Sequence, residues 1–356
     1  MVKSVRLGKS ELQASRIGFG GIPIQRLTEP EAIRVVQRCL ELGVTFLDTA
    51  NGYTTSENRI GRALATLAGR REEVIVATKT SARDRATALE HLELSLKRLN
   101  VDVIDLWQLH NVSTFQTYEQ VLGPDGALEA AEQALELGLA GHIGITSHSM
   151  DVALEAVQSG HFETVQFPFN LVTHEPADKL IPLAREHDVG FIGMKPLGGG
   201  MLSDANLCIK YVLQFDNVIP DPGIEKIAQI EEIAEIVAGS WELAEEEWQD
   251  IERIRAELGT RFCRRCGYCE PCPQGVRISV VMNLRSLWRR LPTERLPQGW
   301  VGEAVKASRA CIECGECEEK CPYQLPIREL LRENIRFYEK AVLEVPSAQS
   351  KEAVGS

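Results

Sequence analysis

Eight short apolar runs, each followed by a segment with helical spacing, constrain the fold of this chain more than any other feature. They cover residues 17–20, 44–49, 74–79, 104–110, 142–146, 165–167, 189–194 and 218–219. Apolar strands that alternate with helices are typical of a parallel sheet covered on both faces. An open doubly wound sheet would explain the first half equally well. The count of eight favours a (β/α)8 barrel, an α/β fold.

Local signals agree with this alternation. Thr28 and Glu31 form a capping-box pattern with Pro30 in the first turn, which predicts a helix over residues 32–42. Gly43 is placed to end that helix before the next strand. The acidic stretch 227–258 predicts the last barrel helix and a connecting helix.

After Gly259 the composition shifts to cysteine, arginine, glycine and proline. Two runs, each followed by a proline, hold eight of the ten cysteines: Cys263, Cys266, Cys269 and Cys272, then Cys311, Cys314, Cys317 and Cys321. Three thiols at two-residue intervals let one loop surround three corners of an iron–sulfur cube, whereas zinc sites usually take thiols in pairs. We therefore expect a barrel over 1–258, a ferredoxin-like iron–sulfur domain over 259–345 and a disordered tail over 346–356.

In two-cluster ferredoxins the fourth cysteine of each run binds the other cluster. That pattern joins Cys321 to the first triplet and Cys272 to the second, which predicts two 4Fe–4S clusters. Only two residues precede Cys272 where three are usual, so one cluster is the alternative. Cys39 and Cys208 lie outside the runs and are expected to be ordinary buried thiols.

Charge and targeting signals limit the partners. The chain of 356 residues has a net charge of −12, which argues against nucleic acid because such binding needs a basic face. The first residues lack the apolar core of a signal peptide, and no apolar stretch reaches the length of a membrane span. Cysteines without a secretion signal favour metal ligation in a reducing compartment. We therefore expect a cytoplasmic protein without membrane attachment.

Four polar residues follow the expected strands at the end where barrel sites lie: Asp48, Tyr53, Lys79 and His110. A phenol is too weak an acid to act near neutrality unless its anion is stabilised, and a nearby ammonium stabilises it. Asp48 is placed to hold Lys79, and His110 to orient a carbonyl oxygen. The four residues therefore predict a proton-transfer site.

These residues resemble the Asp–Tyr–Lys–His set of the aldo-keto reductases, and the resemblance extends from Leu7-Gly8 to about Ile233. It implies that Tyr53 donates a proton to the carbonyl oxygen, tuned by Lys79 and Asp48, while a nicotinamide delivers hydride. With the two cysteine runs, the chain resembles the iron–sulfur-containing branch of that family. There the appendage replaces the usual C-terminal loop.

The same resemblance implies the cofactor contacts: Ser147, His148, Gln166, Asn170, Met194, Lys195, Pro196, Leu197, Gly199 and Lys226. Met194 stands where better-known members place an aromatic ring, so its thioether covers the nicotinamide or fills the core. Lys226 would meet a 2′-phosphate and Glu225 a free ribose hydroxyl. Gln229 and Ile233 stand where the family often has arginine and asparagine. NADPH is the expected cofactor and NADH the alternative.

A second interpretation of the N-terminal glycines fails. Gly18 and Gly20 with Asp48 downstream resemble part of a Rossmann fingerprint, but position 23 is proline where the third glycine belongs. We interpret this segment as a loop.

The sequence therefore predicts an oxidoreductase that reduces an aldehyde or ketone, a small carbonyl substrate. Clusters move single electrons and nicotinamide moves a hydride, and no flavin motif that would couple the two is found. The alternative is an electron-transfer or redox-sensing protein whose clusters serve a protein partner. The loops at 111–126 and after 198 carry no motif that identifies a substrate.

Overall fold

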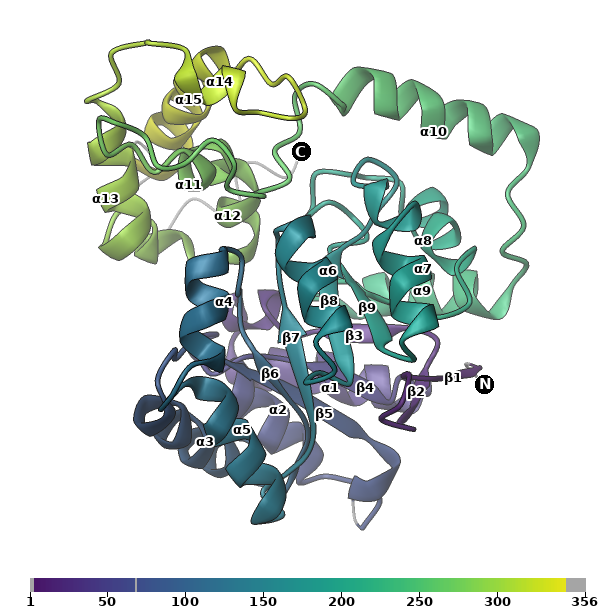
Figure 1. Cartoon of the computed structure of the whole chain (residues 1–356). Coiled ribbons are helices and arrows are strands. Elements are labelled where there is room, and N and C mark those ends of the chain that lie inside the picture. Colours follow the sequence, from purple (N-terminus) through teal and green to yellow (C-terminus); the bar gives the residue numbers. More distant parts are fainter. Residues whose placement is uncertain (1–2, 68, 344–356) are drawn as a thin grey trace. The chain divides into compact units, whose positions relative to one another are not determined.

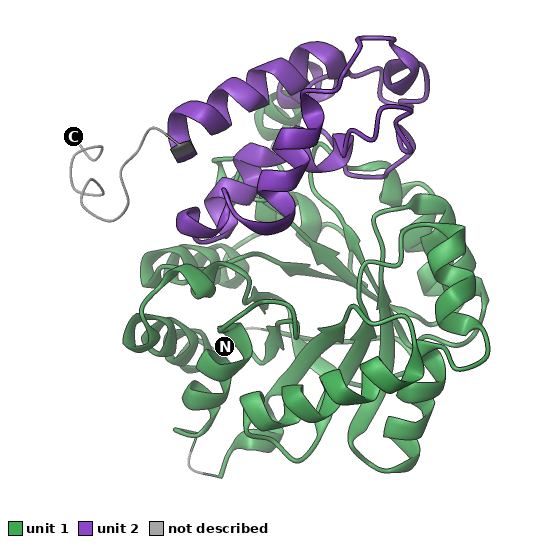
Figure 2. Ribbon diagram, turned by 90° about the vertical axis from the view of Figure 1, so that its left-hand side faces the viewer, with its two compact units in different colours: residues 1–251 green, residues 252–356 purple. Residues whose placement is uncertain are grey.

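The chain forms two compact units, Met1–Ile251 and Glu252–Ser356 (Figure 2). The computed structural model describes residues 3–67 and 69–343, so the tail expected at 346–356 lies outside the described residues. The division between the units falls inside helix α10 (Glu245–Leu258). Each unit has an apolar core of its own.

The first unit is built on eight parallel strands, with helices around them (Figure 1). In sheet order the strands are β3 (Gly18–Gly20), β4 (Phe46–Asp48), β5 (Ile75–Thr80), β6 (Ile104–Leu109), β7 (Ala140–Thr146), β8 (Thr164–Pro168), β9 (Gly190–Met194) and β10 (Val218–Asp221). The Gly20 N–H donates to the Pro222 carbonyl at 2.8 Å, so β3 and β10 meet and close the sheet. The prediction of a (β/α)8 barrel is confirmed. The interpretation of Gly18 and Gly20 as part of a loop is wrong, because both lie in β3, which pairs with β4.

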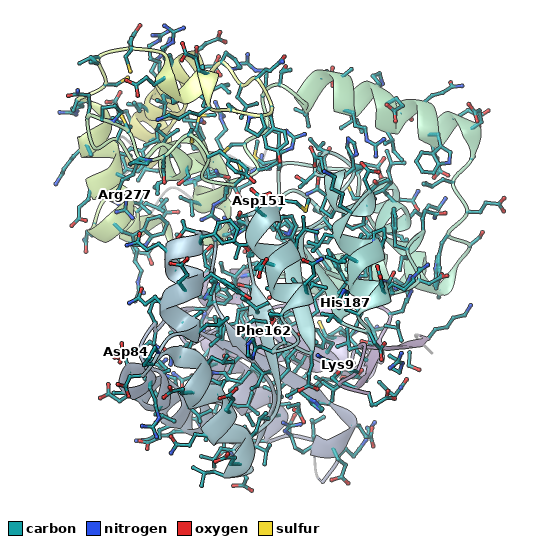
Figure 3. The ribbon with its side chains drawn as sticks, in the orientation of Figure 1. Lys9, Asp84, Asp151, Phe162, His187 and Arg277 are labelled. Carbon is teal, nitrogen blue, oxygen red and sulfur yellow. The ribbon has the colours of Figure 1, made fainter. Side chains whose placement is uncertain are left out.

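The helices of this unit are α1 (Glu29–Glu41), α2 (Ser56–Leu64), α3 (Arg85–Leu99), α4 (Phe115–Leu122), α5 (Ala127–Glu136), α6 (Met150–Gln158), α7 (Leu180–Glu186), α8 (Ala205–Leu213) and α9 (Ile227–Ala238). The predicted capping box begins α1, where the Glu31 carboxylate accepts the Thr28 N–H at 2.9 Å. Gly43 follows that helix with φ of +84°, a backbone that favours glycine. Asp84 caps α3 at the surface, whereas Phe162 before β8 is fully buried (Figure 3).

Apolar side chains fill the barrel toward the N-terminal ends of its strands. The hairpin of β1 (Ser4–Arg6) and β2 (Gln13–Ser15) flanks that end. The apolar cluster there comprises Leu7, Ala14, Phe46, Ile75, Ala77, Leu106, Ile192 and Ile219. Successive strand residues point to opposite faces, so residues two positions further along share the interior face. Asp48, Lys79, Gln108 and Asp221 stand at such positions, which puts polar groups at the C-terminal end of the barrel.

The second unit is helical, with long loops. Its helices are α11 (Ile278–Met282), α12 (Leu284–Arg290), α13 (Gly299–Ser308), α14 (Glu316–Glu319) and α15 (Ile327–Tyr338). Val281, Leu287 and Leu330 belong to its core, and six of the run cysteines pack against that core. Within 3–67 and 69–343, no helix combines the length and the apolar character that crossing a bilayer requires.

Candidate functional site

An ion pair between Lys79 and Asp48 forms the centre of the barrel site. Asp48 ends β4 and Lys79 lies on the neighbouring strand β5, and the two residues are only 3% and 2% exposed. The Lys79 ammonium donates to both Asp48 carboxylate oxygens at 2.5 Å and to the Thr49 carbonyl at 2.7 Å. An ammonium has three protons, so these contacts use all of them and fix the position of the charge.

The environment keeps Lys79 charged. Burial alone would lower the pKa of its ammonium, but the charge of Asp48 and its hydrogen bonds to the ammonium, with added contributions from Tyr53 and Asp221 where these are ionised, outweigh burial and raise that pKa. The ammonium lies 5.6 Å from the centroid of the Tyr53 ring. Tyr53 therefore lies beside a buried positive charge.

Tyr53 and His110 stand at the C-terminal ends of the strands above this pair. Tyr53 lies in the turn between β4 and α2, where its N–H donates to the Ala50 carbonyl at 2.9 Å. His110 directly follows β6, and its N–H donates to the Thr80 carbonyl at 2.8 Å. The rings are half-buried and meet edge to face, with centroids 5.8 Å apart. The structure thus brings the four predicted catalytic residues together, with a phenol beside an ammonium and an imidazole.

Two residues that the sequence analysis did not single out, Gln108 and Asp221, complete this site. The Gln108 amide donates to Asp48 Oδ1 at 3.3 Å. The Gln166 amide lies between two acids, donating to Asp48 Oδ2 at 3.3 Å and to Asp221 Oδ2 at 3.2 Å. We call Asp48, Lys79, Gln108, Gln166 and Asp221 the interior polar cluster. Asp221 was missed because the eighth strand was expected to end at 219, whereas β10 continues to Asp221.

The loops after β7, β8 and β9 bring several of the predicted cofactor residues together. Lys195 Nζ lies 3.0 Å from His148 Nε2, and the Asn170 amide donates to the Lys195 carbonyl at 3.1 Å. The buried Ser147 hydroxyl donates to the Ser149 carbonyl at 3.2 Å. Met194 ends β9 half-buried, and the same loop continues through Pro196, Leu197 and Gly199. These residues therefore form one side of the barrel mouth.

Gln166 carries an acceptor that suits a nicotinamide. Its Oε1 atom is buried and has no hydrogen-bond partner among the described residues. Buried polar atoms are nearly always paired, so an unpaired acceptor at a site indicates a ligand that donates there. The amide N–H groups of a nicotinamide carboxamide are such donors, so the residues present fit this cofactor.

Lys226 belongs to a different segment, between β10 and α9. It is exposed at the start of α9, where the Gln229 side-chain oxygen accepts the N–H groups of Glu225 and Lys226, both at 3.0 Å. Gln229 therefore caps the helix. The Glu225 carboxylate pairs with Arg26 at 3.4 Å, a contact between residues far apart in the sequence that no local pattern indicated.

The run cysteines surround two cavities in the second unit. Cys263, Cys266, Cys269 and Cys321 line one, and Cys272, Cys311, Cys314 and Cys317 line the other, with Cys269 on the wall of both. This exchange of the fourth cysteines is the arrangement expected of two cubes. Over 3–67 and 69–343, no three His, Cys, Asp or Glu residues lie close enough to hold a single metal ion.

The two cysteine loops share one backbone conformation. Arg265 and Gly267 have φ of +64° and +85°, and the equivalent Glu313 and Gly315 have φ of +55° and +88°. In the second loop the helix α14 (Glu316–Glu319) occupies the spacing before the fourth cysteine. The first loop is one residue shorter there and lacks such a helix, yet Cys272 still lines the second cavity. The shorter spacing therefore does not exclude Cys272 as a ligand.

The two remaining cysteines behave as predicted. Cys39 and Cys208 are buried in the barrel unit. Burial raises the pKa of both thiols, that of Cys208 to about 12. They are core residues.

Comparison with known proteins gives matches for both units. A model described as "Aldo/keto reductase family" matches residues 16–207, and one described as "4Fe-4S dicluster domain" matches residues 262–326. The uncharacterized oxidoreductase YqkF of Bacillus subtilis is 29% identical over 216 residues, which cover 57% of this chain and 67% of that protein. The B. subtilis oxidoreductase YrpG, also uncharacterized, is 30% identical over 223 residues, covering 55% and 67%.

Solved structures resemble the barrel unit. The holo form of the aldo-keto reductase AKR11C1 from Bacillus halodurans aligns with a TM-score of 0.62 at 27% identity, covering 71% of this chain and 96% of that one. An aldo/keto reductase from Klebsiella pneumoniae in complex with NADP and acetate aligns with a TM-score of 0.60 at 21% identity, covering 72% and 96%. The second likeness, at lower identity, concerns the fold alone.

Proposed function

This chain belongs to the aldo/keto reductase family and carries a C-terminal 4Fe-4S domain, and from that premise we propose that it reduces a small aldehyde or ketone with NAD(P)H. The observation that carries the proposal is the fully engaged Lys79 ammonium 5.6 Å from the Tyr53 ring. It provides a proton donor whose anion is stabilised by a fixed charge, which is what carbonyl reduction needs. Replacement of Tyr53 by phenylalanine, with carbonyl reduction as the readout, tests it directly.

Each residue of the site has a part in this proposal. Tyr53 donates its phenolic proton to the carbonyl oxygen as negative charge develops there. Lys79 stabilises the resulting phenolate, and Asp48 holds Lys79 in place through its two short hydrogen bonds. His110, at the mouth beside Tyr53, orients the carbonyl oxygen.

The cofactor supplies the hydride when it is bound. Gln166 and Asn170 would hold its carboxamide, and Ser147, His148 and Lys195 would line its path along the barrel mouth. Met194, half-buried at the end of β9, would cover one face of the nicotinamide ring.

We propose NADPH as the preferred cofactor, with Lys226 near its 2′-phosphate. Lys226→Gln removes a charge-assisted contact worth about 1.5–3 kcal/mol, so the KM for NADPH is expected to rise roughly tenfold or more. The KM for NADH should stay unchanged because NADH lacks that phosphate. Lys97→Gln, at another exposed lysine, is the matched control. A wild-type KM for NADH equal to or below that for NADPH would remove the preference.

We propose that the second unit holds two 4Fe–4S clusters, ligated as the two cavities group the thiols. One observation favours the alternative function, electron exchange with a protein partner. The cavity of the second triplet opens to solvent, because Cys314 is exposed and its neighbour Ile312 is 65% exposed. A cluster there would lie within reach of a partner's redox centre.

The two functions are separated by one anaerobic experiment. Clusters are reduced, excess reductant is removed, and NADP+ is added while the visible absorbance is followed. We expect the clusters to stay reduced while the protein still turns over carbonyls, because no two-electron-to-one-electron adaptor is found in the sequence. Reoxidation with formation of NADPH would show that clusters and barrel exchange electrons, in favour of the electron-transfer function.

A further inference from the structure

The interior polar cluster holds one carboxyl group more than its positive charge balances. Lys79 is its one cation, whereas Asp48 and Asp221 are both acids, 3% and 5% exposed. Gln108 and Gln166 are neutral. With both acids ionised, the cluster would carry a net negative charge inside the barrel, where such a charge is strongly disfavoured.

The hydrogen bonds show which of the two acids lacks donors that would compensate a negative charge. The three ammonium protons of Lys79 go to the two Asp48 oxygens and to the Thr49 carbonyl, so none is left for Asp221. Asp221 Oδ2 accepts the Gln166 amide at 3.2 Å. Asp221 Oδ1 is buried and has no donor among the described residues. An ionised Asp221 would thus have one oxygen without a hydrogen bond.

A proton on Asp221 removes the uncompensated negative charge. The Asp48 and Asp221 side chains are neighbours inside the barrel, because the one Gln166 amide donates to an oxygen of each. Burial and the charge of Asp48 raise the pKa of Asp221 well above its ordinary range, and the smaller opposing effects of Lys79 and Gln166 do not restore it. Two neighbouring buried carboxyl groups cannot both ionise readily, so one of them keeps its proton.

The barrel leaves room for this group. A Cβ atom on Gly18 of β3 would lie 3.1 Å from Asp221 Oδ1 and 3.0 Å from the Phe46 ring. The glycine therefore lets the acid lie inside the barrel. The groups that face Asp221 are Asp48 from β4, Lys79 from β5 and Gln166 from β8. Tyr53 is linked to this group through Lys79, whose ammonium lies 5.6 Å from the centroid of the Tyr53 ring.

We propose that Asp221 is a protonated carboxylic acid that donates a hydrogen bond to Asp48, which makes it a positioning residue for the Asp48–Lys79 pair. Its effect on catalysis rests on the proposed reductase function. While Asp221 is neutral, Lys79 remains available to stabilise the Tyr53 phenolate. When Asp221 loses its proton at high pH, a second negative charge opposes that phenolate and proton donation slows.

The variant Asp221→Asn imitates the neutral acid, because its amide both donates to Asp48 and accepts from Gln166 but cannot ionise. The alkaline limb of the pH profile of kcat is expected to move up by about one pH unit or more, with the KM for the cofactor unchanged. At the alkaline end, wild-type kcat should fall about tenfold below that of the variant. Asp216→Asn, at an exposed acid that precedes the same strand, should keep the wild-type profile. Coincident profiles for wild type and Asp221→Asn would overturn the positioning role.

A second readout does not need activity. A protonated carboxyl group has a C=O stretch apart from the amide bands, so infrared spectra at neutral pH should show a band in wild type and Asp216→Asn. Asp221→Asn and Asp221→Leu should both lack it. If the band is present but the protein reduces no carbonyl compound, the proposal of a protonated Asp221 stands and the proposed reductase function is rejected. Its absence from wild type would overturn the protonated acid itself.

The pH dependence of protein stability provides an independent test of the protonated Asp221. A folded-state pKa above the ordinary carboxyl range means that the stabilisation is complete below about pH 4 and declines as the pH rises through the folded value. The amide introduced by Asp221→Asn does not titrate, so the melting temperature of wild type should fall relative to that of the variant with increasing pH. A difference that is independent of pH would count against a protonated Asp221.

Discussion

Replacing Tyr53 by phenylalanine should lower carbonyl reduction by about a thousandfold, the usual contribution of a positioned general acid. In the proposed function the phenolic proton is the one transferred, and the Lys79 ammonium is fully engaged by Asp48 and Thr49. The ring of phenylalanine keeps the edge-to-face contact with His110, so the mouth of the barrel should keep its shape. Turnover of an aldehyde panel with NADPH, followed at saturating cofactor, is the measurement.

The control for this variant separates chemistry from binding. Tyr118→Phe removes a buried phenol on α4 that is not one of the four proposed catalytic residues, and it should leave turnover unchanged. Fluorescence titration with NADPH should give the same dissociation constant for wild type and Tyr53→Phe. Turnover that survives in Tyr53→Phe would exclude Tyr53 as the proton donor.

Removal of iron should unfold the second unit while the barrel stays folded. Six of the run cysteines pack against its core, and metal binding by such ligands is coupled to folding. An anaerobic chelator is therefore expected to remove most of the helical circular dichroism of α11 to α15. The barrel should keep its own unfolding transition, because its strands form a closed sheet with a separate apolar core. Retained helices in the apoprotein would show that the unit folds without metal.

Single thiol variants test how many clusters there are. Wild type should contain about eight iron atoms per chain, and Cys272→Ser about four, because each cube holds about four. Cys208→Ser, at a buried thiol of α8, is the matched control and should keep the full iron content. A wild-type content near four would reject the two-cluster proposal.

The strand order was predictable because each strand is a short apolar run between polar helical segments. The end of the eighth strand was not, since Pro220, Asp221 and Pro222 have the composition of a turn. In the structure β10 continues to Asp221, since pairing with β9 extends to Met194. Interstrand pairing outweighed local propensity there, and it placed an acid inside the barrel.

The cysteine spacing likewise predicted thiolate ligands and the exchange of the fourth cysteines. Spacing alone did not decide whether Cys272 is a cluster ligand, because it is one residue closer to its triplet than in the usual pattern. In the structure Cys272 lines the second cavity, and the segment equivalent to the shorter spacing is the helix α14 in the second loop. No local sequence pattern indicated the ion pair between Arg26 and Glu225, because the two residues are far apart in the sequence.

Sequence by itself determined the eight strands, the residue types at their ends and the ligand type of the second unit, because periodicity and spacing are local properties of a chain. The tertiary structure alone decided which side chains share one environment. Sheet closure places β10 beside β3, and the barrel interior then joins Asp221 to Asp48, Lys79 and Gln166. Protonation states depend on such neighbours and on burial, and these exist only after distant segments have packed together.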